Sequence, residues 1–399
     1  MTLLLSAPEH PYFREIKFVE ADLARFDRHG ACPACGSAGA PRTLVEFGQE
    51  SWRNRVQLVQ CPDCDHVYYL NPPSADFFTR FYREEWNRER EKLAAVKPSR
   101  KVKSTMAELL RDLGHRDHGA PVLEIGCGLG AMLAGLQEAG YRELYGTEAS
   151  DYRAAATASR FPGRIFTGGY EGVPPGLEFG VVVSNHVFEH IYEPADALGW
   201  AVGRLRPGGV IALTVPSAWG EPVINQLLFL PHLHSFCHRS LIAMGRRHGL
   251  DCIFWQGANR PYEVTAVYFR KGEAPAFDPA RFVRAEAAPE AAPRSQAERF
   301  AAPFRRANGR DRVHFALHAD EADSVRLAGQ GGIREVGSAA RALAVIAGPL
   351  ARLLAAVGLR KLGNKRLGRI RFVTGRFVGT DGPVPLLGSE DGRIVFHIK

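Results

Sequence analysis

The sequence predicts an α/β protein with a mostly parallel sheet, preceded by a small cysteine-bearing module and followed by a basic α+β region. Three observations predict this arrangement. Strand-like and helix-like segments alternate between residues 121 and 271, as in a parallel sheet covered on both faces. The stretch PVLEIGCGLGAML joins a short apolar run to an acid and a glycine-rich turn. Two C-x2-C pairs stand near the N-terminus.

The elements follow from local pattern. Aromatic residues at helical spacing predict a helix at Phe77–Leu93, and an amphipathic segment predicts a second at Ser104–Leu113. Gly140 and Gly249 are suited to the position after a helix end. Beyond these we expect strands at 122–126, 144–149, 179–185, 209–216, 250–256 and 263–271, and helices at 131–140, 152–160, 194–205 and 240–249.

Length and composition set the broad class. With 399 residues, 45% hydrophobic and 24% charged, the chain resembles globular proteins of two or three domains. No apolar run reaches the ~20 residues that span a bilayer, so no transmembrane helix is expected. The stretch MTLLLSAPEH lacks a basic n-region and has only a short apolar run, so the expected compartment is the cytoplasm.

The glycine turn predicts a nucleoside-binding site. Gly126, Gly128 and Gly130 let the backbone approach a ligand, and the helix that follows offers unpaired N–H groups. Glu148, at the end of the next strand, is placed to accept both hydroxyls of a ribose, which a dinucleotide and a sulfonium nucleoside share. Glu124 favours the sulfonium, because a carboxylate beside a pyrophosphate would repel it.

These segments together resemble the class I S-adenosylmethionine-dependent methyltransferases. The resemblance covers about 150 residues: VLEIGCGLGAML, GTEAS, VVVSNHVFEHIYEPADAL and LRPGGVIALTVPS, in this order. It implies a Rossmann-like seven-stranded sheet with its last strand antiparallel, and methyl transfer from S-adenosylmethionine. The resemblance also implies roles in cofactor binding. Near the methionine part it places Glu124, Gly126, Gly128 and Gly130, and at the ribose it places Glu148. Gly169 and Tyr170 would lie near the adenine, and Asn185 and His186 would face the sulfonium.

The cysteine pairs predict a structural zinc site. Cys32, Cys35, Cys61 and Cys64 form C-x2-C-x25-C-x2-C, and four thiolates give a closed tetrahedral Zn2+ site with no position for water. In such knuckles the residue after the second cysteine often needs a left-handed backbone, which Gly36 adopts freely and Asp65 tolerates. A zinc-ribbon-like module followed by QCPDCDHVYYLNPP and an aromatic helix resembles a subset of these methyltransferases, many of which act on sugars, nucleotide-linked sugars or other small intermediates.

Three histidines are candidate catalytic residues: His186, His232 and His234. His186 follows the fourth strand and the other two follow the fifth, at the sheet edge where α/β proteins bind ligands. His232 also matches the H-x-x-x-F-x-x-x-S-L segment of the family. A hydroxyl or ammonium acceptor needs a base, whereas a thiol or amine acceptor can react without one, so the sequence does not fix a base.

The net charge of +8 lies in one segment. Residues 336–380 contain nine Lys and Arg and no Asp or Glu, which suits a phosphate-bearing substrate, RNA or an anionic membrane surface, but also a solvated helical hairpin. The cysteine module is not basic, so nucleic acid is the less favoured partner.

We expect a small-molecule or glycan-type acceptor. The alternatives are an RNA methyltransferase, a non-catalytic protein that kept the cofactor fold and, third, an NAD-dependent dehydrogenase.

The expected organisation has five parts. They are an N-terminal extension (1–30), a zinc-binding module (31–75), a methyltransferase domain with its leading helices (76–272), a linker rich in Ala, Pro, Glu and Arg (273–306) and a basic accessory domain (307–399).

Overall fold

The computed structural model describes residues 26–47, 56–84, 100–218, 231–257, 263–288 and six short strands elsewhere. Those short strands are β1 (Thr2–Leu3), β2 (Ile16–Lys17), β15 (Phe315–His318), β16 (Ile333–Glu335), β17 (Ile370–Gly375) and β18 (His397–Ile398). The rest of the predicted linker and basic accessory domain, including most of the cationic segment 336–380, lies outside the described residues.

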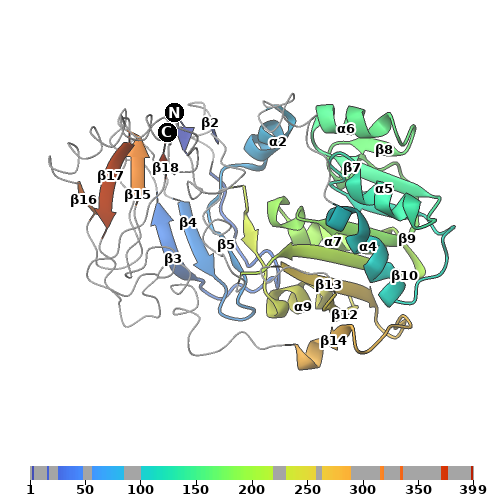
Figure 1. The fold of residues 1–399 in the computed structure, drawn as a ribbon. Helices are drawn as coiled ribbons and strands as arrows, with labels where there is room; N and C mark the ends of the chain where they lie inside the picture. The colour runs from blue at the N-terminus through green and yellow to red at the C-terminus, as the bar shows by residue number, and fades with distance from the viewer. Residues whose placement is uncertain are drawn as a thin grey trace, which may run out of the picture.

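An eight-stranded sheet, on the right of Figure 1, has the strand order β14-β12-β13-β10-β9-β6-β7-β8. Its strands are β6 (Val122–Ile125), β7 (Leu144–Glu148), β8 (Ile165–Thr167), β9 (Phe179–Asn185), β10 (Leu205–Pro216), β12 (Leu250–Trp255), β13 (Glu263–Arg270) and β14 (Phe282–Arg284). Strands β6 to β10 pair in parallel, and β13 is antiparallel to both β10 and β12. This is the predicted Rossmann-like order with its antiparallel last strand.

One strand exceeds the predicted seven. β14 pairs antiparallel with β12 at the edge of the sheet and lies in the range expected to be a linker. Its Phe282 is buried and packs in a hydrophobic cluster with Trp255, so burial of this side chain fixes the short strand.

Helices cover both faces of the sheet (Figure 1). On one face α4 (Arg100–Asp112) and α5 (Ala131–Glu138) bury Leu109 and Leu133 in one cluster. On the other face α7 (Pro194–Gly203) and α9 (His238–Arg246) bury Leu198 and Met244 in a second cluster. A further helix, α6 (Asp151–Ala158), begins at Ser150, whose hydroxyl accepts a hydrogen bond from the Arg153 N–H.

The cysteine module is a second sheet, which a strand from the larger domain completes. Its order is β11-β5-β4-β3, with β3 (Arg42–Phe47), β4 (Val56–Gln60), β5 (Val67–Tyr69) and β11 (His234–Ser235), all antiparallel. Because β11 follows β10 in the chain, the two regions share backbone hydrogen bonds. Helix α2 (Ala75–Glu84) then leads from the module toward the larger sheet.

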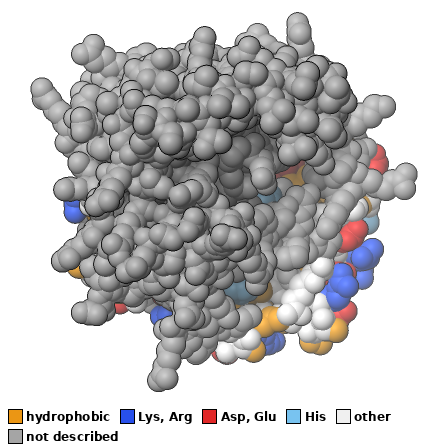
Figure 2. Space-filling view, turned by 60° about the vertical axis from the view of Figure 1, so that its left-hand side comes forward, with side chains coloured by type: hydrophobic (Ala, Val, Ile, Leu, Met, Phe, Trp, Pro, Cys, Tyr) orange, Lys and Arg blue, Asp and Glu red, His pale blue; other side chains and the backbone are white. Residues whose placement is uncertain are grey.

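The surface seen in Figure 2 mixes Lys and Arg with Asp, Glu and apolar side chains among the described residues. Within the described part of the chain, no helix is both long and apolar enough to cross a bilayer.

Candidate active site

The glycine turn between β6 and α5 combines two packing positions with one open position. Gly126, Gly128 and Gly130 all have positive φ, at 76°, 55° and 71°. A Cβ at Gly126 would collide with the Val187 side chain, and one at Gly130 would lie 2.8 Å from Thr157 Cγ2. A Cβ at Gly128 would meet no described atom within 4 Å. The open side of Gly128 is therefore where a ligand can approach the backbone.

Glu148 ends β7 beside this turn. Its Oε2 accepts a hydrogen bond from the Gly128 N–H at 2.8 Å, and its Oε1 accepts one from the Ser150 N–H at 2.9 Å. Burial raises the pKa of Glu148, and these backbone donors act in the opposite direction. Each carboxylate oxygen keeps a second lone pair, so the oriented group can still accept hydrogen bonds from two neighbouring hydroxyls.

Glu124 lies in β6 and is only 4% exposed. Its Oε2 has no hydrogen-bond partner among the described residues. Burial raises the pKa of Glu124 well above its usual range, and the neighbouring Glu148 adds to the effect. A buried carboxylate oxygen without a donor is a site for a cationic or hydrogen-bond-donating group.

The other predicted cofactor residues lie at the carboxyl ends of the next strands. Gly169 follows β8 and precedes the 3-10 turn η2 (Tyr170–Gly172). The Tyr170 ring packs against Trp200, with centroids 5.3 Å apart. Asn185 is the last residue of β9 and stands in register with Thr214 of β10. Parallel strands thus bring these positions to the same edge as Glu124 and Glu148.

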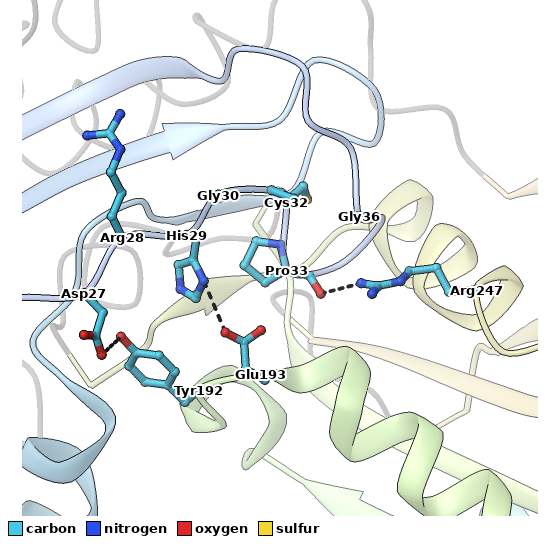
Figure 3. A pocket seen from close by; sticks show the side chains of 11 residues that line it. Asp27, Arg28, His29, Gly30, Cys32, Pro33, Gly36, Tyr192, Glu193 and Arg247 are labelled. Atoms are coloured by element: carbon cyan, nitrogen blue, oxygen red, sulfur yellow. Dashed lines mark hydrogen bonds and ion pairs between the residues drawn. The ribbon is translucent and has the colours of Figure 1, made fainter.

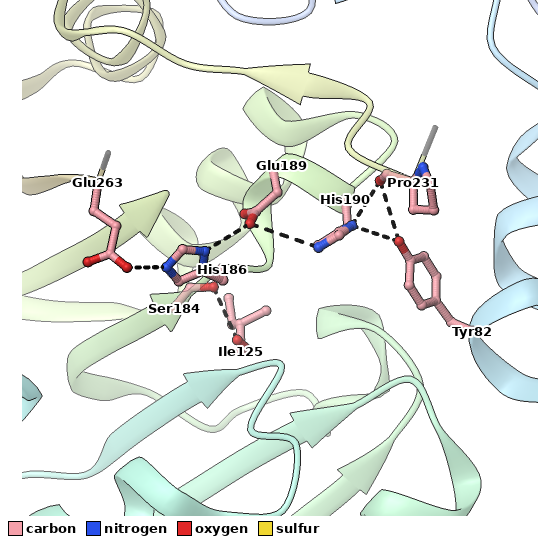
Figure 4. Close-up of polar contacts among 8 residues, drawn as sticks. All are labelled: Tyr82, Ile125, Ser184, His186, Glu189, His190, Pro231 and Glu263. Atoms are coloured by element: carbon pink, nitrogen blue, oxygen red, sulfur yellow. Dashed lines mark hydrogen bonds and ion pairs between the residues drawn. The ribbon is translucent and has the colours of Figure 1, made fainter. Parts of the chain in front are cut away.

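His186 lies between two carboxylates just beyond β9 (Figure 4). Its Nε2 is 2.8 Å from Glu263 Oε1, and its Nδ1 is 3.4 Å from Glu189 Oε1. Burial by itself lowers the pKa of His186, but the two carboxylates outweigh it and raise the pKa to about 9. His186 also has φ of 54°, a strained value for a non-glycine residue, of the kind that clusters at functional sites.

Glu263 was not among the sequence candidates. It begins β13, and a strand antiparallel to its neighbours begins at the edge where the parallel strands end. An acid at the start of EVTAVYFR is the signal that could have found it. Tyr82 of α2 was also missed, because only the folded chain brings that helix beside η3 (Phe188–His190).

The histidine candidates separate into two places. His232 lies near the His186 network, with its ring edge-on to His190 at 4.6 Å between centroids. His234 is instead a buried residue of β11 in the second sheet, where its Nδ1 is 3.1 Å from His66 Nε2 and its Nε2 is 3.3 Å from the Tyr192 carbonyl. Burial lowers the pKa of His234 well below its usual value, so the structure gives this histidine a packing environment.

The four cysteines converge as a tetrahedral metal site requires. Cys32 and Cys64 have sulfurs 3.7 Å apart, and Cys35 and Cys61 have sulfurs 3.6 Å apart. Four Zn–S bonds of about 2.3 Å place sulfurs ~3.8 Å apart, so the thiols fit Zn2+. The predicted left-handed residues are confirmed, with φ of 77° at Gly36 and 59° at Asp65.

A cavity of about 500 Å³ lies between the module and the larger domain (Figure 3). Several of its polar side chains pair across the junction. Tyr192 donates to Asp27 Oδ2 at 2.9 Å, His29 Nδ1 is 3.4 Å from Glu193 Oε1, and Arg247 donates to the Pro33 carbonyl at 3.3 Å. These contacts attach the loop that carries Cys32 to the larger domain.

Comparison with known proteins agrees with this geometry. Residues 78–253 match the family model described as a methyltransferase domain. A probable S-adenosylmethionine-dependent methyltransferase of Mycolicibacterium smegmatis is 32% identical over 107 residues, which are 26% of this chain and 41% of that protein. The match thus spans about two fifths of the relative's length.

Three solved structures of low sequence identity are similar to parts of this chain. The CcbJ methyltransferase of Streptomyces caelestis is 15% identical with a TM-score of 0.35, covering 43% of this chain and 90% of its own. The sugar N-methyltransferase KedS8 of Streptoalloteichus is 16% identical with a TM-score of 0.35, covering 42% and 87%. Magnesium protoporphyrin IX methyltransferase of Synechocystis, with bound SAH, is 15% identical with a TM-score of 0.40, covering 50% and 100%.

Proposed function

We propose that this chain, whose residues 78–253 match the model of a methyltransferase domain, is a class I S-adenosylmethionine-dependent methyltransferase that transfers a methyl group to a small-molecule or glycan-type acceptor. The observation that supports this most directly is the carboxylate of Glu148, fixed by the Gly128 N–H beside a turn that is open only at Gly128. Bound there, S-adenosylmethionine supplies an electrophilic methyl group for in-line displacement.

The chain's own residues fit that cofactor better than a dinucleotide. Glu148 accepts hydrogen bonds from the two ribose hydroxyls, and Gly128 allows close approach of the nucleoside. The buried carboxylate of Glu124, whose Oε2 has no partner among the described residues, would stabilise a cationic methionine portion, whereas it would repel a pyrophosphate. Gly169, Tyr170 and Asn185 complete the proposed pocket wall.

The acceptor side is rich in carboxylates and imidazoles. With a pKa of about 9, His186 is protonated at neutral pH, so we assign it the positioning of Glu189 and Glu263 rather than proton removal. Glu263 can then accept a hydrogen bond from an acceptor hydroxyl or amine. His232 borders the same region, and His234 takes no part in the proposed chemistry.

We propose a structural role for Zn2+ at the four cysteines. All four ligands would be thiolates, so the ion would have no open coordination position for chemistry. It would instead hold the loop around Cys32 to the strand that follows Cys64. We also propose that the chain has the five parts described above, and that its basic region binds the phosphate group of a phosphate-bearing acceptor.

Cofactor binding to the full chain tests the assignment. In a calorimetric titration with S-adenosylmethionine, we expect Glu148→Gln to weaken binding ten- to a hundredfold, the ~1.5–3 kcal/mol of a hydrogen bond to a charged group. Glu178→Gln, an exposed carboxylate ahead of β9 at the opposite edge of the sheet, is the matched control and should bind as the wild type does. Absence of binding by the wild-type protein, or equal affinity of both variants, would overturn the proposed site.

A further inference from the structure

Three potential metal ligands outside the cysteine site converge beside the proposed acceptor region. Glu189 and His190 lie in η3, and His232 lies just ahead of β11. One carboxylate oxygen and one ring nitrogen from each histidine all lie within 4.8 Å of one another. A bound ion needs only a modest contraction of this set, because Zn–N and Zn–O bonds are about 2.0–2.2 Å long.

The Glu189 carboxylate is the unusual member. It is 1% exposed, and neither oxygen has a hydrogen-bond partner among the described residues. The His186 Nδ1 lies 3.4 Å from Oε1, but His186 also serves Glu263 at 2.8 Å. One imidazole ring therefore lies between two carboxylates. A buried carboxylate in this state is stabilised by a further positive partner.

His190 is oriented as metal-ligating histidines are (Figure 4). Its Nδ1 lies 2.8 Å from the Pro231 carbonyl, and a carbonyl only accepts, so the ring proton is on Nδ1. The Nε2 lone pair therefore faces Glu189 Oε1, 3.9 Å away. That distance is too long for a hydrogen bond and suits two ligands of one ion. A ring N–H donated to a backbone carbonyl is the usual outer contact of a metal-bound imidazole.

Tyr82 supports the same ring orientation from α2. Its hydroxyl is 2.8 Å from His190 Nδ1 and donates to the Pro231 carbonyl at 3.4 Å. The segment before β11 and helix α2 thus hold the imidazole from two sides.

We propose that Glu189, His190 and His232 bind a divalent transition metal, foremost Zn2+, at a site separate from the cysteines. Two imidazoles and one carboxylate suit zinc, and three protein ligands leave a fourth position open to water or substrate. The open coordination position binds an oxygen or nitrogen of the acceptor, a statement that rests on the proposed methyl transfer. The metal site itself depends only on the geometry above.

Metal content and cobalt spectroscopy test the site without measuring turnover. The full chain, saturated with zinc and then desalted, should contain about two zinc ions per chain by mass spectrometry, against about one for Glu189→Gln and for His190→Asn. With Co2+, thiolate charge-transfer absorption should appear in all proteins, whereas the weaker visible bands of a nitrogen and oxygen site should be lost in both variants. His118→Asn, which changes an exposed histidine ahead of β6, is the control and should retain both ions.

Unchanged thiolate absorption and S-adenosylmethionine affinity in the variants would show that they are folded. The proposal is overturned by a wild-type chain that retains only one zinc ion, or by variants that keep the second one. In the first case Glu189 and His190 would instead be an acid–base pair without metal. Loss of cofactor binding by the wild type would reject the proposed function while leaving the metal count interpretable.

Discussion

At the scale of single residues, Glu124 combines burial with an unused hydrogen-bonding atom. Its carboxylate is 4% exposed, and its Oε2 is unpaired within the described part of the chain. In the ligand-free protein, burial favours the protonated form and raises the pKa. A cationic ligand favours the ionised form. The same side chain therefore couples cofactor binding to proton release.

This coupling predicts a pH-dependent affinity. Because the folded pKa lies above the usual value, S-adenosylmethionine must displace a proton from Glu124 at pH values between the bound-state and free-state pKa. The affinity should rise with pH, by at most tenfold per unit, and level off once the free protein is ionised. Titrations at several pH values on the wild type and Glu124→Gln measure this. An equal slope in Glu124→Gln would show that another group is responsible.

The folding stability of the ligand-free protein should depend on pH in the opposite direction from the affinity. Between the unfolded pKa and the raised folded pKa, the folded state binds more protons at Glu124 than the unfolded state does. The contribution of Glu124 to folding stability therefore falls as pH rises through that interval. The buried Glu124 carboxylate therefore lowers the stability of the ligand-free fold, as is expected of a group that is retained to bind a ligand.

Individual residues were predictable from sequence where the local pattern determines them. The positive φ values of Gly36 and Asp65 follow from the chemistry of the cysteine turns, and the structure has them. The environment of His234 did not follow, because its partner His66 is far away in sequence and comes beside it only when β11 pairs with β5. Contacts of this kind depend on how the second sheet is assembled.

At the scale of elements, the turn between β6 and α5 separates packing from binding. Gly126 supports the backbone against Val187, whereas Gly128 faces open space. Both need positive φ, so an alanine at either position carries a similar backbone cost of about 1 kcal/mol. The difference between the stability losses of the two alanine variants therefore measures the clash between the new Cβ and Val187.

We therefore expect opposite profiles for two alanine variants. Gly126→Ala should lose about 2–4 kcal/mol of unfolding free energy, because it adds overpacking to backbone strain. Gly128→Ala should lose about 1 kcal/mol but bind S-adenosylmethionine at least tenfold more weakly. Denaturant unfolding and calorimetry measure the two quantities. Equal stability losses, or wild-type affinity in Gly128→Ala, would contradict the division of roles.

Elements defined by long apolar runs were predicted, and those defined by tertiary pairing were not. The strands β6, β7, β9, β10, β12 and β13 have their own apolar patterns, so their order could be expected. β14 has three residues and exists through its pairing with β12, and β11 has two residues and exists through its pairing with β5. Segments this short carry too little periodicity to be recognised alone.

At the scale of the whole molecule, the cysteine module is attached to the larger domain through several contacts. Arg239 of α9 donates to Asp65 Oδ2 at 2.6 Å, and Arg247 donates to the Pro33 carbonyl. With the β5–β11 pairing, these contacts fix the module to the domain, and α2 then places Tyr82 against His190. The sequence indicated both regions but not their joint surface, because each supplies only half of every contact.

Transfer of a labelled methyl group is the most direct test of the account. The full chain would be incubated with methyl-labelled S-adenosylmethionine and a cell extract that has been separated into low-mass, protein and RNA fractions. We predict that label enters the low-mass or glycan fraction with the wild type and Glu178→Gln, and at least tenfold less with Glu148→Gln. Label found in RNA, or no label transferred by the wild type, would contradict the proposed small-molecule methyltransferase.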